Sequence, residues 1–326
     1  MTDTIQWLLD SGGPWTRYRT LVDLLDRPTD DPEVLAARSE MVEHPQVRTL
    51  ISKAAGWPGY PLKRHNDAKH PIYALSTLAD FGLRAHDPGL QSIIDAVLAH
   101  QSKEGAFQCQ MNVSPKYGGT GEDTWGWMTC DAPTLLFALL AMGLRDDHRV
   151  QKAVQHLVAL AEQSGYRCLV SPELGRFRGP GRKDDPCPIA NVYALKALSL
   201  VPEQHDSPAA HAGAELLLAH WAHETRGKLF LFGVGRKFIR LKYPYVWFDI
   251  LHVAEVLSRY RFVHQDPRFH RLIGAITDQA DSQGRYTAGS MYTSWKGWSF
   301  ADKKQPSPWL TFLVRRIEQR VTVHAK

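Results

Sequence analysis

The sequence has little cysteine and no long apolar run. Only 4 of its 326 residues are cysteine, and they stand far apart, at Cys109, Cys130, Cys168 and Cys187. Such spacing excludes the disulfide scaffold of a small secreted protein and favours reduced thiols, for which metal binding is a common use. No run of about 18 apolar residues occurs, so we expect no transmembrane helix. The N-terminal segment lacks the basic start and apolar core of a secretory signal, which predicts a cytoplasmic protein.

Charge of one sign is not concentrated anywhere in the chain. The net charge is +5, and no block of about five or six like charges occurs, so we expect no nucleic-acid partner. A mild positive charge suits a small anionic ligand. Linkers and low-complexity segments are also missing, which predicts one domain over residues 1–326.

Strand-like alternation of useful length is missing too, so the chain is predicted to be all-α. What is present is an internal repeat of apolar helices, most of which open on Asp or Cys. The clear copies begin at Asp67, Asp131, Cys187 and Asp249, and weaker ones at Trp15 and Trp309.

Amphipathic helices with one polar face are expected between the apolar ones, over residues 32–52, 88–101, 148–163, 208–223 and 267–279. This alternation predicts an inner layer of fully buried helices and an outer layer half in solvent. About six such hairpins in succession predict an α/α toroid, with an open superhelical solenoid as the alternative.

The repeat places chemically active residues at equivalent positions. Asp67, Asp131 and Asp249 begin inner helices, whose N-termini in a toroid meet at one mouth of the central cavity. His70 and His252 follow Asp67 and Asp249 by three residues, one turn deeper on the same face. These acids and His70 are candidates for acid–base catalysis. The alternative is that the aspartates only cap their helices.

Cys187 occupies a repeat position that is Asp in the other three clear copies, and Asp185 precedes it by two residues. A thiolate, an imidazole and a carboxylate that converge suit Zn²⁺, with a fourth position open for catalysis. The alternative is that Cys187 is a small buried hydrophobic residue.

Basic and aromatic residues gather in the long loops. Cations suit a diphosphate or another anionic head group, and an aromatic rim suits an apolar cavity, although solvated loops and ordinary packing are the alternatives. The candidate substrate contacts are Arg178, Arg182, Lys183, Arg236, Lys237, Trp125, Trp127, Tyr245 and Trp247.

These motifs resemble those of the terpenoid cyclase and protein prenyltransferase superfamily. The turn from Gln101 to Phe107 resembles the Gln- and Gly-containing turn of triterpene cyclases. A basic loop leading into Asp185-Pro186-Cys187, followed by Asp249-Ile250-Leu251-His252, resembles the zinc motifs of the protein prenyltransferase β subunit. The resemblance implies Asp185, Cys187 and His252 as zinc ligands, and Arg182 with Lys183 as diphosphate contacts. Pro188 stands where that family carries an aromatic residue.

The resulting expectation is a zinc-dependent prenyl or alkyl transferase that acts on an apolar, anionic substrate. Whether a partner subunit completes the site stays open. One alternative is a metal-free terpenoid cyclase that uses Asp131 as its acid. Another is a non-catalytic toroid that binds a lipid or a peptide, because a fold does not fix a function.

Overall fold

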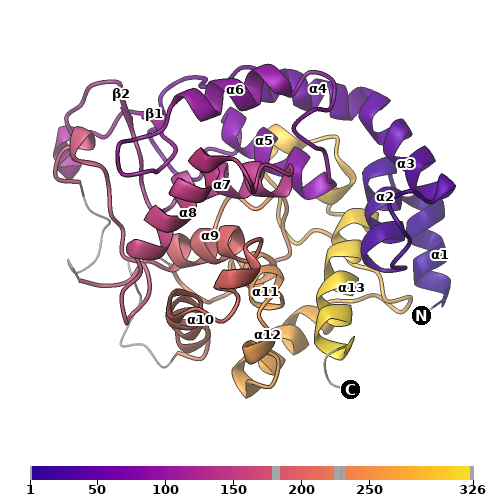
Figure 1. Cartoon of the computed structure of the whole chain (residues 1–326). Coiled ribbons are helices and arrows are strands. Elements are labelled where there is room, and N and C mark those ends of the chain that lie inside the picture. Colours follow the sequence, from indigo (N-terminus) through magenta and orange to yellow (C-terminus); the bar gives the residue numbers. More distant parts are fainter. Residues whose placement is uncertain (1, 178–183, 224–228, 230–231, 324–326) are drawn as a thin grey trace. The chain divides into compact units, whose positions relative to one another are not determined.

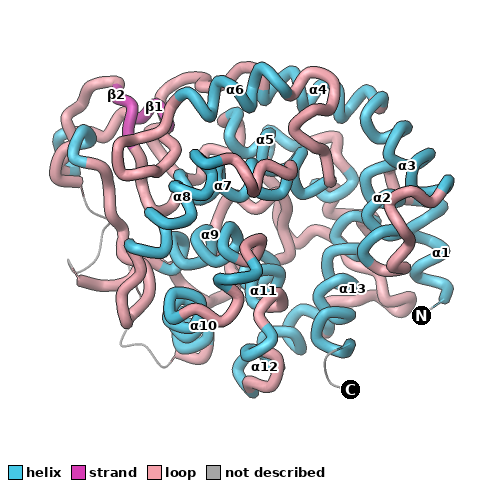
Figure 2. The backbone as a smooth tube through the Cα atoms, viewed as in Figure 1, coloured by secondary structure: helices cyan, strands magenta, loops and turns pink. Residues whose placement is uncertain are grey.

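The computed structural model describes residues 2–177, 184–223, 229 and 232–323. The described chain is mostly helical (Figures 1 and 2). Its α-helices are α1 (Thr2–Ser11), α2 (Pro14–Asp23), α3 (Pro32–Glu43), α4 (Pro45–Ala54), α5 (Pro71–Phe81), α6 (Gln91–Ala99), α7 (Ala132–Ala141), α8 (His148–Ala159), α9 (Pro188–Leu198), α10 (Pro208–Trp221), α11 (Ile250–Leu257), α12 (Pro267–Thr277) and α13 (Pro308–Val323).

Most of these helices begin with local stop-and-start signals in the sequence. Proline is the first residue of many of them, where its missing N–H costs no hydrogen bond. The side chains of Asp31, Asp147 and Asp266 accept hydrogen bonds from backbone N–H groups in the first turns of α3, α8 and α12. Such caps fix the helix starts independently of the tertiary fold.

The chain divides into two compact units, and residues 51–234 with 246–248 form one of them. In this unit α5 packs on α7 and α7 packs on α9. Every residue of α5 and α9 is buried, whereas α6 and α8 bury only one face. The inner and outer helices therefore form the layers predicted from the alternating pattern (Figure 1).

The second unit consists of residues 1–50, 235–245 and 249–326, and so joins both ends of the chain. Helix α13 packs against α1 and α2 from the N-terminal end and against α11 from the C-terminal part. Helix α11 is buried throughout, as expected for an inner helix, while α12 buries one face.

The fold class is confirmed: the chain is mainly α-helical, and its helices pair as the inner and outer hairpins of the α/α-toroid type. One difference is a small antiparallel pair of strands, β1 (Cys109–Met111) and β2 (Thr124–Gly126). Three residues are too few for an alternating pattern to show in the sequence. No helix in the described part of the chain is both long and apolar enough to cross a bilayer.

Several helix boundaries differ from the sequence-based prediction, and two of the differences concern where a helix begins or is interrupted at a proline. The outer helix expected over residues 32–52 is two helices, because His44 is extended ahead of Pro45, a conformation that proline imposes on the residue before it. Helix α5 begins at Pro71 rather than just after Asp67, with His70 as its N-cap. The single domain expected over residues 1–326 stays a prediction.

Candidate active site

Asp131 stands at the start of α7 but does not cap it. Its side chain is 1% exposed and makes no capping hydrogen bond. Proline at the second position of the helix offers no N–H to such a cap. Asp249, by contrast, accepts a hydrogen bond from the backbone N–H of His252 at 3.0 Å and caps α11. The capping interpretation therefore holds for Asp249 and fails for Asp131.

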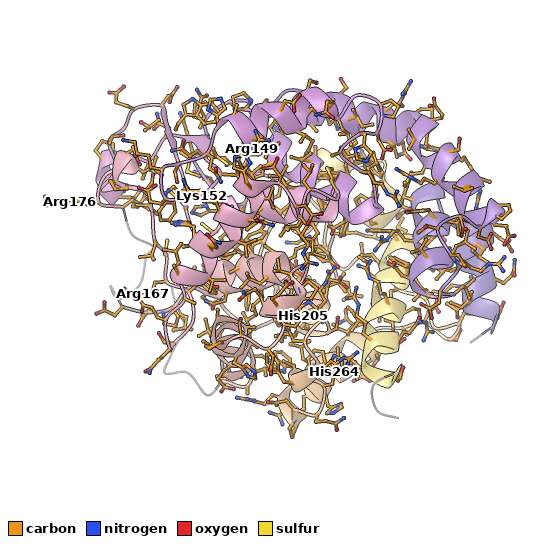
Figure 3. The ribbon with its side chains drawn as sticks, in the orientation of Figure 1. Arg149, Lys152, Arg167, Arg176, His205 and His264 are labelled. Carbon is orange, nitrogen blue, oxygen red and sulfur yellow. The ribbon has the colours of Figure 1, made fainter. Side chains whose placement is uncertain are left out.

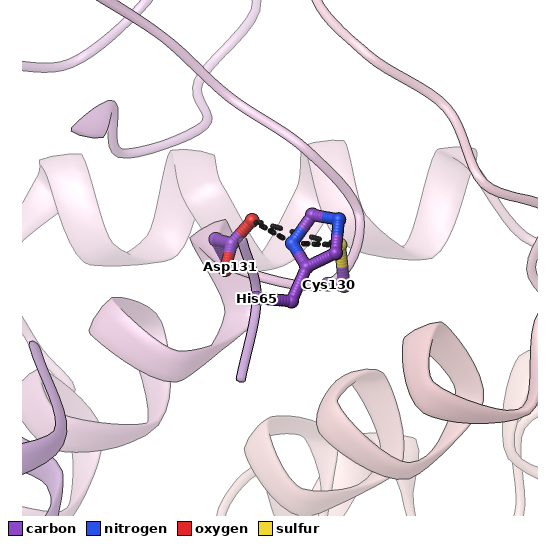
Figure 4. A group of neighbouring side chains, drawn as sticks. All are labelled: His65, Cys130 and Asp131. Carbon is purple, nitrogen blue, oxygen red and sulfur yellow. Dashed lines mark hydrogen bonds and ion pairs between the residues drawn. The ribbon is translucent and has the colours of Figure 1, made fainter. Parts of the chain in front are cut away.

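The Asp131 carboxylate instead contacts two side chains, His65 and Cys130 (Figure 4). Its Oδ2 lies 2.9 Å from Nδ1 of His65 and 3.6 Å from Sγ of Cys130. The sulfur lies 3.2 Å from the same imidazole nitrogen. Oδ1 of Asp131 is buried without a hydrogen-bond partner among the described residues. We call these three residues the His65 cluster.

Backbone pairing holds the two chain segments of the His65 cluster in place. The loop that carries His65 is bound to β1, because the N–H of Leu62 donates to the carbonyl of Gln110 at 2.9 Å. The Tyr73 hydroxyl on α5 donates to the carbonyl of His65. On the other side, the backbone N–H of Thr129 donates to the carbonyl of Leu169 at 3.0 Å. The cluster is therefore fixed from three directions before any ligand binds.

His65 and Asp131 lie on the wall of a cleft of about 260 Å³. The cleft is lined by Leu62, Lys63, Arg64, His65, Met111, Asn112, Val113, Ser114, Tyr117, Met128, Asp131 and Phe177. Lys63 and Arg64 are exposed and also line a neighbouring hollow of about 590 Å³. Neither of these cations forms an ion pair with another residue in the described ranges, so both are available to an anion.

The charges in the cluster depend on one another. Burial opposes protonation of His65, but the Asp131 carboxylate and its hydrogen bond outweigh burial and raise the pKa of the imidazole. Burial, reinforced by the Asp131 charge, raises the pKa of the Cys130 thiol well above its ordinary value. The pKa of the imidazole and the pKa of the thiol are therefore both raised, so the environment favours the protonated form of each of these two groups.

The other two predicted acid–base residues have local structural partners. Asp67 accepts a hydrogen bond from the Tyr60 hydroxyl at 2.7 Å and lines the larger hollow. His70 is 1% exposed, and its Nδ1 accepts from the backbone N–H of Ile72 at 3.4 Å. The expected position of His70 one turn inside the helix is wrong, because α5 starts after it. Catalytic roles for Asp67, His70 and Asp249 stay predictions.

The predicted zinc ligands do not belong to the His65 cluster. Cys187 is 4% exposed, and burial raises the pKa of its thiol. Asp185 is partly exposed two residues before it. His252 belongs to the other unit, where its ring stacks on Tyr245 with the centroids 4.7 Å apart. Zinc at these three residues stays a prediction.

The predicted cationic contacts are only partly described. Arg178, Arg182 and Lys183 lie outside the described residues. Arg236 and Lys237 are exposed on the loop of residues 235–241. In the other unit, Arg167 pairs with Asp184 at 3.0 Å, and Arg176 is exposed in the segment that leads to residue 177 (Figure 3).

The predicted aromatic contacts pack against other rings rather than line the cleft. Trp125 stacks on His100, with centroids 3.6 Å apart, and Trp127 packs among Ala106 and Ala132. Tyr245 is 2% exposed, and Trp247 packs on Phe232. These four residues do not line this cleft, and their role in binding a substrate stays a prediction.

No protein-family profile matches the chain, and no curated protein matches its sequence. Several solved structures resemble the chain, and three of them do so at 13–14% identity. One is unsaturated glucuronyl hydrolase from Bacillus sp. GL1, described as responsible for the degradation of glycosaminoglycan, with 14% identity, TM-score 0.49 and coverage of 95% of this chain and 87% of that one.

The second is a UGL variant with the saccharide dGlcA-Glc-Rha-Glc, at 14% identity, TM-score 0.49 and the same coverage of 95% and 87%. The third is a protein from Actinoplanes, at 13% identity and TM-score 0.43, which covers 96% of this chain and 90% of that one. Likeness at this level assigns neither a family nor an activity to the chain.

The interpretation as a prenyltransferase or terpenoid cyclase is wrong. Two of these three structures are glucuronyl hydrolases named with carbohydrate, and none of the three is described as a prenyltransferase or a cyclase. The expected apolar, isoprenoid-like substrate is corrected as well, because the hydrolase structures are named with carbohydrate. The cleft itself combines polar side chains such as Asn112 with apolar ones such as Met111 and Phe177.

The sequence-based prediction missed His65 and Cys130. Cys130 directly precedes Asp131 at the start of an inner helix, and this adjacent pair of metal-binding or proton-transfer residue types was the available signal. His65 lies in a loop and gave no comparable signal, because it is 66 positions from Asp131 in the chain.

Proposed function

We propose that the cleft is the active site of an enzyme that hydrolyses a polar, anionic substrate, with Asp131 and His65 as its acid–base pair. The observation that carries the proposal is that the buried Asp131 carboxylate leaves its own helix uncapped and binds His65 on the cleft wall. A buried carboxylate that is hydrogen-bonded to an imidazole on a cleft wall is suited to general acid–base catalysis.

The pair has the arrangement that proton transfer requires. A carboxylate bonded to one ring nitrogen orients the imidazole. The second nitrogen, which lies 3.7 Å from Sγ of Cys130, is the one that would exchange a proton with the substrate. In hydrolysis the water oxygen bonds to one half of the substrate, and the proton that water loses passes through the pair to the leaving oxygen. Atoms and charge balance without any further reactant.

Lys63 and Arg64 supply the specificity in this proposal. Their unpaired charges at the cleft favour a carboxylate or a phosphate on the substrate. Asn112 and Ser114 add hydrogen-bonding side chains to the same wall. Acidic saccharides and phosphate or carboxylate esters fit this lining, and glycosaminoglycan fragments, named with the Bacillus enzyme, belong in the set of substrates to test.

The experiment measures hydrolysis of these two substrate classes by the wild type and by Asp131→Asn, His65→Gln and Asp147→Asn. The first two variants should lose at least about 100-fold in kcat, while Asp147→Asn should not, because Asp147 caps α8, pairs with Arg149 and does not line the cleft. Lys63→Ala with Arg64→Ala should raise KM and leave kcat nearly unchanged. Full activity in Asp131→Asn, or a wild type inactive on both classes, would refute the proposal.

A further inference from the structure

We infer that His65, Cys130 and Asp131 together bind one divalent transition metal, with zinc the best match to the ligand types. The inference rests on the proposed function and changes how its site would work: with a metal bound, His65 and Asp131 would be ligands, and metal-bound water would replace the His65–Asp131 pair as the group that loses a proton. Its test, however, does not depend on turnover.

The donor atoms are of the three kinds that zinc uses in proteins. The cluster offers an imidazole nitrogen, a thiol sulfur and a carboxylate oxygen, all within 4.8 Å of one another. Calcium and magnesium prefer oxygen ligands alone, whereas sulfur with nitrogen selects zinc or a similar soft cation. It is the one such group of three among the described residues.

The separations of the donor atoms fit one face of a tetrahedron. Zinc bonds of roughly 2.0 Å to nitrogen or oxygen and roughly 2.3 Å to sulfur place ligand atoms about 3.3–3.6 Å apart at tetrahedral angles. The observed edges are 2.9 Å from His65 to Asp131, 3.2 Å from His65 to Cys130 and 3.6 Å from Cys130 to Asp131. A shift of a few tenths of an ångström brings all three to bonding distance.

The buried carboxylate supplies an independent reason for a cation. Oδ1 of Asp131 has no hydrogen-bond partner among the described residues, although the side chain is 1% exposed. A buried acceptor without a partner is costly. A divalent cation beside the carboxylate would satisfy this charge, while the imidazole contact alone leaves one oxygen unused.

The support around the ligands is already in place. Tyr73 holds the backbone of His65, and the Thr129 hydroxyl donates to the carbonyl of Arg167 at 2.8 Å next to Cys130. Partners of this kind orient metal ligands and raise affinity. Because His65 and Asp131 line the cleft, a fourth coordination position facing the cleft would bind water and lower its pKa.

The experiment uses the full chain, stripped with a chelator and titrated with Zn²⁺ alone. We expect about one zinc per chain, as zinc sites of this type hold a single ion. Affinity should fall at least tenfold in His65→Gln, Cys130→Ser and Asp131→Asn. Cys187→Ser is the matched control, because it removes a buried thiol outside the cluster, and it should bind zinc like the wild type.

Cobalt substitution provides a second measurement. It identifies the thiolate ligand from an absorption band of the bound metal, so it does not require that all variants have the same stability. Co²⁺ bound to the wild type should show a thiolate charge-transfer band, which Cys130→Ser should lose and Cys187→Ser should keep. A folded chain that binds no zinc, or loss of metal only in Cys187→Ser, would overturn the inference. Turnover by the metal-free protein would support the proposed function and refute a role of the metal in it. Bound zinc without turnover would support the metal site and refute the proposed function.

Discussion

At the residue scale, Asp131 and Asp249 show how the same residue at the same kind of position takes different environments. Both are 1% exposed at the start of an inner helix. One carboxylate oxygen of Asp249 accepts a hydrogen bond from the first turn of its helix. Burial, opposed by Lys242, raises the pKa of the Asp249 carboxyl to about 7. Asp131 gives its oxygen to His65. The difference lies in the partner rather than in burial.

The raised pKa of Asp249 predicts a pH-dependent stability. Below about pH 4 the carboxyl is protonated in both states and its effect on the free energy of unfolding vanishes. As the pH rises towards 7, the unfolded chain ionises while the folded chain stays protonated, so stability falls. Asp249→Asn removes this penalty and should stabilise the protein by roughly 2–4 kcal/mol at pH 8, and hardly at all at pH 4.

Urea unfolding of the wild type and Asp249→Asn at both pH values checks this prediction. Asp147→Asn provides the opposite control, because hydrogen bonds and charge from Arg149 hold the pKa of Asp147 at about 2. A carboxyl whose pKa is lowered by folding stabilises the folded state at any pH above its pKa in the unfolded chain. Asp147→Asn should therefore lower the free energy of unfolding at pH 8. Equal effects of the two variants would contradict the environments described for them.

At the element scale, buried side chains fasten loops to the inner helices. Asn191 on α9 is fully buried and receives a hydrogen bond from the backbone N–H of Tyr166 at 2.9 Å. Its amide donates back to the carbonyl of Tyr166 at 2.9 Å and to that of Cys187 at 2.8 Å. One side chain therefore holds the turn that precedes the segment carrying Cys168.

Asn191→Ala leaves buried backbone groups without partners and should reduce the free energy of unfolding by about 2–4 kcal/mol. Exposed Asn66 is the matched control, and Asn66→Ala should change stability by less than about 0.5 kcal/mol. Chemical denaturation with the same probe for both variants measures the difference. A loss below 1 kcal/mol for Asn191→Ala would mean that the turn is held by other contacts.

At the scale of the molecule, one unit is made from both ends of the chain. Arg316 on α13 donates to Asp23 on α2 at 2.9 Å and to Glu255 on α11 at 2.9 Å. Glu255 is fully buried; burial disfavours its charge, but Arg316, Arg320 and Arg259 outweigh burial and lower its pKa. This network links helices that are up to 293 positions apart.

Glu255→Gln removes the buried carboxylate that Arg316 shares with Arg259 and Arg320, although Arg316 keeps its pair with Asp23, and should cost about 3–5 kcal/mol. Because the folded-state pKa of Glu255 is lowered, its contribution is present above about pH 4.3 and is lost as the pH falls. Acid should therefore narrow the gap between the wild type and the variant. The surface pair of Glu203 with Arg145 is the control, since Glu203→Gln should cost less than 1 kcal/mol. An equal effect at both sites would contradict the network.

The helices and their layers follow from the sequence, because their causes are local. Proline, capping aspartates and the alternation of apolar with amphipathic segments act within one or two turns, and they predicted the inner helices at Asp131, Cys187 and Asp249. The boundary at α5 was misplaced since the repeat alignment ignored Pro71, which starts the helix three residues later than the alignment implied.

The site was decided only by the tertiary structure. The sequence by itself determined that Asp131 begins an inner helix, but a helix cap and a reactive acid have the same local pattern. What separates them is His65, which a loop bound to β1 brings to the carboxylate from 66 positions away. Pairings such as Leu62 with β1 depend on the packed chain rather than on neighbouring residues, so no periodicity in the sequence could reveal them.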